Sequence, residues 1–219
     1  MQPAAFSSPQ RSAALLRAPR FPILTLDERK LTPALGYIFS KEWLDPCESL
    51  VSILWKFEKA NALPGHVVAR LMGPDVDPYE GIVPELGRVD IARLRESLPV
   101  PVRTLRAALL QSSGRRRYNP AFRFCRRCVA IGYHSVLHQM ESIGVCPAHR
   151  RPLETACRSC GYEAPYRVSV QLLEAAYRCT CCRASYGGRG WTPNRAHPMK
   201  TDHRKAFTRR YFEQCLGRP

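Results

Sequence analysis

The sequence is short of acidic side chains and of long apolar runs. It has 18 Asp and Glu against 34 Lys and Arg, a formal net charge of +16. No stretch approaches the ~20 apolar residues of a membrane-spanning helix. The apolar stretch 13–16 is also too short for the core of a secretory signal. These absences argue against a membrane or secreted protein and favour the cytoplasm, where thiols stay reduced.

The excess of positive charge favours a polyanionic partner. A basic surface attracts phosphate backbones, acidic proteins or anionic membranes, and the arginines of this chain cluster, which favours nucleic acid. The alternative is a solvated surface that only keeps the protein soluble. Because 45% of the residues are hydrophobic, the chain has enough apolar side chains to bury a core.

The order of apolar and turn-forming residues predicts four regions. We expect an irregular leader at 1–40, a helical domain at 41–113, a tandem zinc-binding domain at 118–190 and a basic tail or helix at 191–219. The polar, basic stretch 112–117 marks the main boundary. The expected fold is therefore a mainly α N-terminal helix-turn-helix domain plus a small α+β domain of tandem zinc-finger or zinc-ribbon type.

The helical domain is predicted from apolar spacing. Leu50, Ile53, Leu54 and Phe57 fall at i, i+3, i+4 and i+7, which indicates one apolar face of a helix at 48–60. We expect this helix to start at Asp45–Pro46. A second short helix is expected at 65–72, after a tight turn, and this pair suggests a helix-turn-helix. Further helices are expected at 89–98 and 102–111.

Eight cysteine and histidine residues form four half-sites within 58 residues. The half-sites are Cys125 with Cys128, Cys146 with His149, Cys157 with Cys160, and Cys179 with Cys182. A CxxC or CxxH turn presents two ligands on one side, and a second turn brought alongside completes a tetrahedron. Gaps of roughly 15–20 residues between half-sites are typical of zinc modules. The pattern predicts two structural Zn²⁺ ions as cofactors.

The half-sites can be paired in sequence or in a cross-braced order. We favour the sequential order, first with second and third with fourth, because it closes shorter loops. Both resulting sites are four-coordinate and rich in thiolate, so no position is left open for catalysis. A redox role is the rival interpretation, but no thioredoxin-like βαβ pattern surrounds any CxxC. We expect the remaining Cys47, Cys181 and Cys215 to be small buried hydrophobes.

His134 and His138 have the i, i+4 spacing of helical metal ligands. The four-ligand sets are complete without them and the chain has no HExxH motif, so we interpret both as surface or core histidines. No catalytic residue is predicted.

Arginines crowd the hinge and the first zinc turn. The candidate nucleic-acid contacts are Arg115, Arg116, Arg117, Arg123, Arg126 and Arg127. Tyr118, Phe122 and Phe124 lie among them and suit base stacking, or they cover the zinc module. A second basic cluster, at 200–210, lies on a predicted terminal helix with Phe207, Tyr211 and Phe212. Two roles are compatible with this helix: it binds a polyanion, or it packs its aromatic face against the rest of the protein.

Two segments resemble the TniQ family of transposition proteins. One is the helical segment Glu48-Ser49-Leu50 with Ala60-Asn61-Ala62-Leu63. The other is the order CxxC, Gly132-Tyr133-His134, CxxH and CxxCG through Cys160-Gly161. The likeness spans about 45–182. It implies a non-enzymatic adaptor for DNA transposition target selection, and the length of the chain resembles that of the short form in CRISPR-associated transposons. The implied partners are an AAA+ regulator ATPase and DNA or guide RNA, with a Cas effector in some systems, and no membrane.

Two other functions are compatible with parts of the sequence. A zinc-containing helix-turn-helix transcription regulator would use 65–72 as its recognition helix, but that segment offers only His66 and Arg70 for reading bases. A zinc-supported nuclease of the HNH type would need a general-base histidine beside a metal-binding partner set, and acids are scarce after Glu174. The adaptor is the leading interpretation.

Overall fold

A computed structural model describes residues 37–111, 117–188 and 190–215. The predicted leader, up to residue 36, therefore lies outside the described residues, as do Arg115 and Arg116. Regular structure in the described part is helical, and its extended segments meet only in isolated β-bridges. The expectation of a helical fold is confirmed. The strands expected of an α+β zinc domain are reduced to single bridges such as Phe124 with Glu154.

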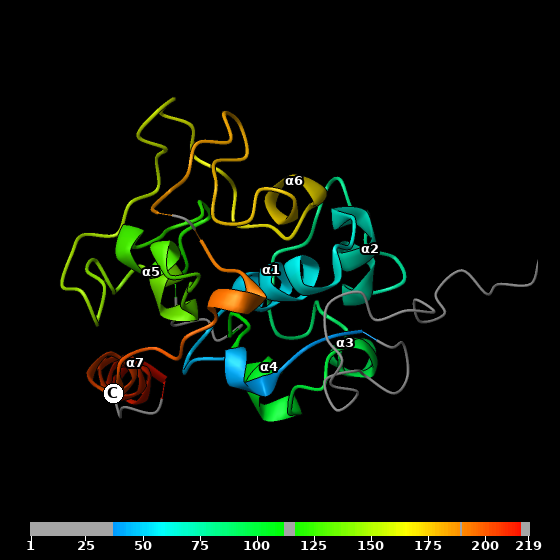
Figure 1. Cartoon of the computed structure of the whole chain (residues 1–219), viewed down its shortest axis with the longest axis horizontal. Coiled ribbons are helices and arrows are strands. Elements are labelled where there is room, and N and C mark those ends of the chain that lie inside the picture. Colours follow the sequence, from blue (N-terminus) through cyan, green and yellow to red (C-terminus); the bar gives the residue numbers. More distant parts are fainter. Residues whose placement is uncertain (1–36, 112–116, 189, 216–219) are drawn as a thin grey trace, which may run out of the picture.

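The helices are short, apart from the first and the last (Figure 1). The α-helices are α1 (Leu50–Asn61), α2 (Gly65–Ala69), α3 (Ile91–Ser97), α4 (Val102–Ala107), α5 (Arg126–Ala130), α6 (Val170–Leu173) and α7 (Thr201–Cys215). The 3₁₀ turns are η2 (Lys41–Trp43), η3 (Arg70–Met72), η4 (Val136–Gln139) and η5 (Pro193–Arg195).

Helix α1 is the centre of the molecule. Nine of its twelve residues are buried, and it lies among the other elements in Figure 1, with α2 and α6 packed against it. Its start differs from the prediction. Ser49, not Asp45, caps the helix, because the Ser49 hydroxyl accepts a hydrogen bond from the Ser52 N–H and Glu48 is held in a β-bridge with Ser135.

The predicted second helix is confirmed in extent but not as a uniform helix, because α2 passes into the 3₁₀ turn η3. The α2 helix packs against α6. This approach requires a glycine at 65, since a Cβ there would lie 2.9 Å from Cγ of Glu174. The predicted helix 102–111 is shorter than expected and ends at Ala107.

One apolar core runs across the predicted boundary near 112–117. It joins residues of α1 to residues beyond Arg117, and Trp55 contacts both Phe122 and Tyr177 edge-on at 5.6 and 4.8 Å. The Trp55 indole N–H donates to the Leu172 carbonyl. The division into four regions stays a prediction, but the regions before and after the hinge share a single core.

The last residues of the predicted leader are part of this core. Tyr37, Ile38 and Phe39 are buried, and Tyr37 contacts Phe57 edge-on. The Asn61 side chain accepts a hydrogen bond from the Ile38 N–H and donates one to the Ile38 carbonyl. Residues 37–40 are irregular, as predicted for the leader, but 37–39 are packed into the core beside the end of α1.

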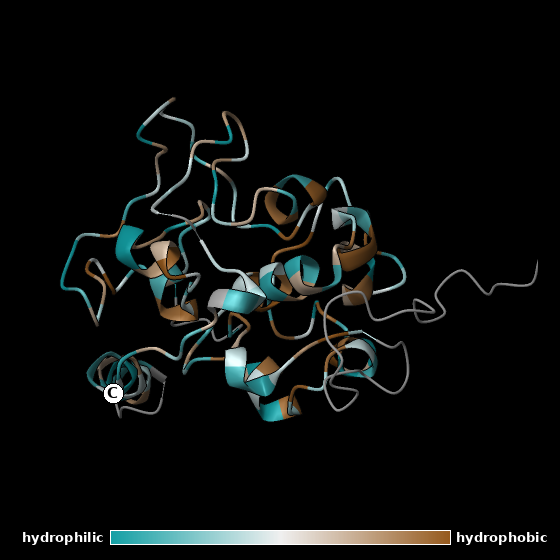
Figure 2. Cartoon of the chain, viewed as in Figure 1, coloured by the Kyte–Doolittle hydropathy of each residue, from teal (hydrophilic) through white to brown (hydrophobic). Residues whose placement is uncertain are grey.

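A second, smaller apolar cluster surrounds the first group of metal ligands. It contains Cys125, Cys128, Tyr133, Leu137, Cys146 and Phe207 among its buried residues. Phe207 is fully buried and its ring lies 5.0 Å from that of Tyr133. Helix α7 thus packs through Phe207 against Tyr133 and His138, which follow the first pair of cysteines, while most of its other residues are hydrophilic (Figure 2). Among the described residues, no helix combines the length and apolar character needed to cross a bilayer.

Candidate metal centres and the network beside them

The eight predicted metal ligands meet in two groups of four. Cys125, Cys128, Cys146 and His149 form the first cluster, and Cys157, Cys160, Cys179 and Cys182 form the second cluster. Within each cluster the ligand atoms lie within 4.8 Å of one another. This is the sequential pairing, and the cross-braced alternative is not the one observed.

The spacing of the ligand atoms fits a tetrahedral ion. Sulfur atoms bound to one zinc at about 2.3 Å lie about 3.8 Å apart along a tetrahedron edge, and sulfur–nitrogen edges are slightly shorter. Cys128 Sγ lies 3.6 Å from Cys146 Sγ and 3.3 Å from His149 Nδ1. In the second cluster Cys157 and Cys182 are 3.6 Å apart at sulfur, and Cys160 and Cys179 are 3.7 Å apart. The donor set therefore fits a soft divalent metal.

Three of the four half-sites share one backbone turn. In the turn that starts at Cys157, the Gly161 N–H donates to the Cys157 carbonyl and the Cys157 N–H donates to the Tyr162 carbonyl. The turns that start at Cys146 and Cys179 repeat both hydrogen bonds. The fifth residue of each turn has positive φ: 50° at Arg150, 74° at Gly161 and 60° at Arg183.

The first half-site is built differently, on a helix. Cys125 is the residue before α5 and Cys128 lies within it, and the Val129 N–H donates to the Cys125 carbonyl. The chain leaves this helix at Gly132, which has φ of 76° and which lies so close to Trp191 that a Cβ would fall 2.0 Å from the tryptophan Cβ. The glycine of the Gly132-Tyr133-His134 segment is therefore required by both its backbone and its neighbour.

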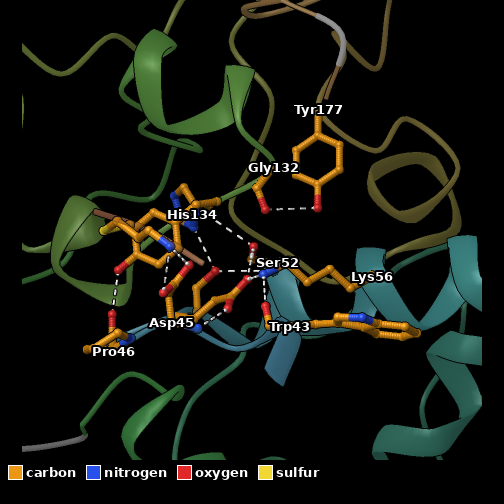
Figure 3. A network of polar contacts seen from close by, with 12 residues as sticks. Trp43, Asp45, Pro46, Ser52, Lys56, Gly132, His134 and Tyr177 are labelled. Carbon is orange, nitrogen blue, oxygen red and sulfur yellow. Dashed lines mark hydrogen bonds and ion pairs between the residues drawn. The ribbon is translucent and has the colours of Figure 1, made fainter. Parts of the chain in front are cut away.

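A buried polar network links the segment 132–135, which follows the first pair of cysteines, to the start of α1 (Figure 3). His134 Nε2 lies 2.8 Å from the Arg123 carbonyl, so it carries the proton and donates it. His134 Nδ1 then accepts from the Ser49 hydroxyl at 2.7 Å. Burial lowers the pKa of His134 to about 4, against its bond to Arg123, so the ring is neutral near pH 7. The interpretation as a core histidine is confirmed.

The same network contains a buried ion pair. Lys56 Nζ lies 2.6 Å from Glu48 Oε1 and donates to the Trp43 carbonyl. Glu48 also accepts from the Ser52 hydroxyl and the Asp45 N–H. Burial raises the pKa of Glu48, and Lys56 opposes that effect. Because Glu48 and Lys56 each have further hydrogen-bond partners, this buried ion pair holds η2 and the residues before α1 against the helix.

The Tyr133 hydroxyl donates to the Pro46 carbonyl, and the Ser135 hydroxyl donates to the Cys47 carbonyl. Tyr177, which lies between the two half-sites of the second cluster, donates to the Gly132 carbonyl (Figure 3). His138 is also fully buried, with its Nδ1 accepting from the Ser135 N–H. Neither His134 nor His138 belongs to a metal cluster.

The predicted arginine patch is not a single surface. Arg117 and Arg127 are exposed and Arg126 is half-buried, with its Nε donating to the Tyr186 carbonyl. Arg123 is buried, and its guanidinium donates to the Met140 and Ile143 carbonyls. The prediction that Arg123 belongs to a surface patch was wrong, because its guanidinium is bonded to the loop before Cys146. Arg115 and Arg116 lie outside the described residues.

The aromatic residues among these arginines are not surface platforms. Phe122 and Phe124 are buried and stack at 5.7 Å, and Tyr186 lies 4.2 Å from Phe124. Tyr118 is half-buried and accepts from the Gln111 N–H. Phe122, Phe124 and Tyr186 belong to the apolar core that also contains Trp55, Cys157 and Cys179, so these three rings pack inside the protein and do not form a surface for base stacking.

The leftover cysteines differ. Cys47 is half-buried beside the Phe207 carbonyl, whereas Cys181 is exposed. The expectation of a buried Cys181 was wrong, because the turn that aims Cys179 and Cys182 at one point directs the residue between them to solvent. The side chain of Cys215 lies outside the description.

A pocket that no sequence pattern indicated lies beside the first cluster. It has a volume of about 730 Å³ and is lined by residues from three segments: Arg127, Ala130 and Ile131; His149; and Gly190, His197, Pro198, Met199, Lys200 and His203. These segments are far apart in the chain, so no local pattern joins them.

Comparison of the chain with protein-family models and with curated protein sequences gives no match.

Proposed function

We propose that each cluster holds one structural Zn²⁺. Four ligands fill each tetrahedron, and the thiolate-rich donor set is the one that zinc prefers in structural sites. The ions would stabilise loops that have few other contacts. Metal analysis of the purified protein should give two zinc per chain, and the two ions should be lost in the corresponding cysteine variants.

We further propose that the protein is a non-enzymatic adaptor for DNA transposition target selection. In this role it links an AAA+ regulator ATPase to a target-recognition complex or to target DNA. The proposal rests on the resemblance to the TniQ family. One observation supports it: the two segments that carry the resemblance contact each other, through Ser49 with His134 and through Tyr133 with Pro46.

This contact matters because it makes the two motifs one structural unit. The Ser49 hydroxyl both caps α1 and donates to His134. A displacement of His134, in the zinc-binding half of the chain, would therefore also disturb the start of α1. An adaptor needs such a rigid connection if one half binds the ATPase and the other binds nucleic acid. The helical half is our candidate for the ATPase contact, and Arg117, Arg126 and Arg127 belong to the candidate nucleic-acid face.

The ATPase contact is tested by co-sedimentation with the filament of the cognate ATPase. We expect the protein to pellet with the filament and to saturate. A protein that stays in the supernatant at saturating ATPase would contradict the adaptor proposal. The matched control is the variant Arg117→Glu/Arg127→Glu, in which two charges are reversed. It should no longer bind nucleic acid but should still pellet with the ATPase filament.

The alternative, a helix-turn-helix transcription regulator, has less support. Helix α2 has five residues, of which Gly65, Val68 and Ala69 are buried, and it packs against α6. A recognition helix needs a free face with several base-reading side chains, and here His66 and Arg70 are the polar residues available. Protection of a defined promoter in a footprint would restore this alternative.

A nuclease is also disfavoured by the site geometry. His149 is placed as a metal ligand through Nδ1, and of the described residues that line the adjacent pocket none is acidic. Metal-dependent cleavage of plasmid DNA would contradict the non-enzymatic proposal.

A further inference from the structure

We propose that the pocket beside the first cluster binds one nucleotide of a single-stranded nucleic acid. The base would lie on the apolar wall of the pocket and the phosphate on its cations. This inference rests on the proposed nucleic-acid contact of the adaptor and does not depend on the ATPase contact.

The chemistry of the lining carries the proposal. Arg127 and Lys200 are exposed cations from two different segments that line the pocket, and no acidic side chain is among the described lining residues. The apolar part consists of Ala130, Ile131, Pro198 and Met199. Ile131 is 51% exposed, which is unusual for an isoleucine. A ligand that fits must therefore be anionic at one end and flat or apolar at the other.

His149 adds a directed donor. Its Nδ1 faces the three sulfur atoms of the first cluster, at 3.3–3.6 Å. A metal-bound histidine carries its proton on the other nitrogen, which normally donates to a carboxylate, a carbonyl or water. Here Nε2 has no partner among the described residues, while the ring lines the pocket and lies edge-on to His203 at 4.7 Å. The pocket thus has a fixed N–H donor available for a phosphate oxygen.

The size and surroundings favour a strand over a small free anion. A volume of about 730 Å³ lies within the range of small-molecule sites and exceeds what a lone phosphate fills. A second, basic groove adjoins it, between the turn at Cys146 and α7, and includes Arg150, Lys205, Arg209 and Arg210 in its lining. His149 and Arg150 are consecutive, and in α7 the pocket residue His203 lies between the groove residues Asp202 and Lys205.

The groove also contains two acids, Asp202 and Glu213. Arg209 and Arg210 both pair with Glu213, so Arg150 and Lys205 are its stronger candidates for phosphate contact. A strand that follows α7 would place successive phosphates on these cations and one base in the pocket. Single strands are commonly bound in this way, by a basic track with sites for individual bases.

The test is fluorescence anisotropy with a labelled 12-nucleotide single strand, measured at several salt concentrations. The pocket variant is Arg127→Ala/Lys200→Ala. The control, Arg88→Ala/Arg95→Ala, removes the same charge from exposed positions in the helical half. Both must keep two zinc ions and the wild-type circular dichroism spectrum.

We expect the pocket variant to bind at least tenfold more weakly than the control. In a plot of log K against log [salt], the slope for the pocket variant should be smaller in magnitude than that of the wild type by about 1.4. Each of the two lost phosphate contacts contributes about 0.7 to this slope. Ile131→Ser should weaken binding with an unchanged salt slope, because it removes contact with the base and no charge.

Three results would overturn the inference in different ways. Equal binding by the pocket variant and the control overturns the pocket alone and leaves the proposed nucleic-acid contact intact. Failure of the wild-type protein to bind any strand overturns both. Adenosine monophosphate that binds as tightly as the 12-mer would assign the pocket to a free nucleotide and overturn the strand proposal.

Discussion

The two metal clusters use similar ligands but lie in opposite surroundings. In the first cluster the three cysteines are buried within an apolar cluster that includes Tyr133 and Phe207. In the second, Cys160 and Cys182 are exposed, and the loops that carry them project beyond the helices at the top of Figure 1. The first is part of the packing of the molecule, and the second holds together loops that extend from it.

The clusters also reach α1 by different means. The segment that follows the first pair of cysteines meets the start of α1 through the bond of Ser49 to His134 and the bridge of Glu48 to Ser135. The second meets the middle of α1 through α6, which lies between its two half-sites and packs against α1. Loss of the first cluster should therefore disturb the whole fold, whereas loss of the second should be more local.

The largest expected effect comes from replacing one cysteine ligand in each metal cluster. Cys128→Ser should cost more than about 5 kcal/mol of unfolding free energy, because structural zinc contributes on the order of 10 kcal/mol and the core around it is lost too. Cys182→Ser should reduce zinc from two to one and keep cooperative unfolding. Cys181→Ser is the control and should keep both ions. The measurements are zinc content and urea unfolding.

If Cys128→Ser does not fold, the wild-type protein still tests the comparison. Chelator should release zinc in two phases, with the exposed second cluster first, and Cys182→Ser should lack the fast phase. Release in a single phase, or a fast phase that survives in Cys182→Ser, would contradict the contrast between the clusters.

The link between the first cluster and α1 is tested by Ser49→Ala. We expect a loss of about 2–4 kcal/mol, because the variant loses an N-cap worth about 1 kcal/mol and leaves the buried His134 Nδ1 without a donor. Asp90→Ala is the matched control, since Asp90 caps α3 at an exposed site, and should cost about 1 kcal/mol. Equal losses in urea unfolding would mean that the bond to His134 contributes nothing.

The side of α1 that faces α6 makes stability depend on pH through Glu58. Burial, with a contribution from Glu174, raises the pKa of Glu58 from 4.5 to about 7 in the folded protein, and Lys59 opposes this. A raised carboxyl pKa stabilises the fold below about pH 4.5, and that contribution is lost as the pH rises through 7.

Glu58→Gln should therefore gain stability relative to wild type between pH 5 and 8.5. After allowance for partial exposure, we expect a gain of about 1–2 kcal/mol, measured by urea unfolding at each pH. The exposed control Glu96→Gln should show no such trend. A constant difference between Glu58→Gln and wild type across this range would contradict the raised pKa.

The smallest expected effect concerns the shared turn of the half-sites. Gly161→Ala should cost about 1 kcal/mol, because its φ of 74° is unfavourable for a residue with a Cβ. Gly144→Ala has open space around it and no positive φ, and should be close to neutral. The readouts are unfolding free energy and the rate of zinc release from the second cluster. Faster release in Gly144→Ala than in Gly161→Ala would argue against the turn.

Much of the local structure could be predicted from the sequence. The apolar face of α1 follows from the spacing of Leu50, Ile53 and Phe57, and the helices at 65–72 and 91–97 were expected within a few residues. The start of α1 was misplaced because Ser49 and Asp45 are both good capping residues, and only the bridge of Glu48 to Ser135 decides between them. The burial of 37–39 depends on Asn61, 22 residues or more away.

The sequence by itself determined which eight residues are candidate ligands, because the spacing within each half-site is a local property of the chain. The lengths of the connecting loops favoured the sequential pairing, and the structure decided it. The tertiary structure alone decided which arginines are exposed, that one core spans the hinge, and that Arg127, His149 and Lys200 line one pocket. These outcomes depend on contacts between distant segments, and those contacts are set by how apolar faces such as that of Phe207 pack, which no local pattern encodes.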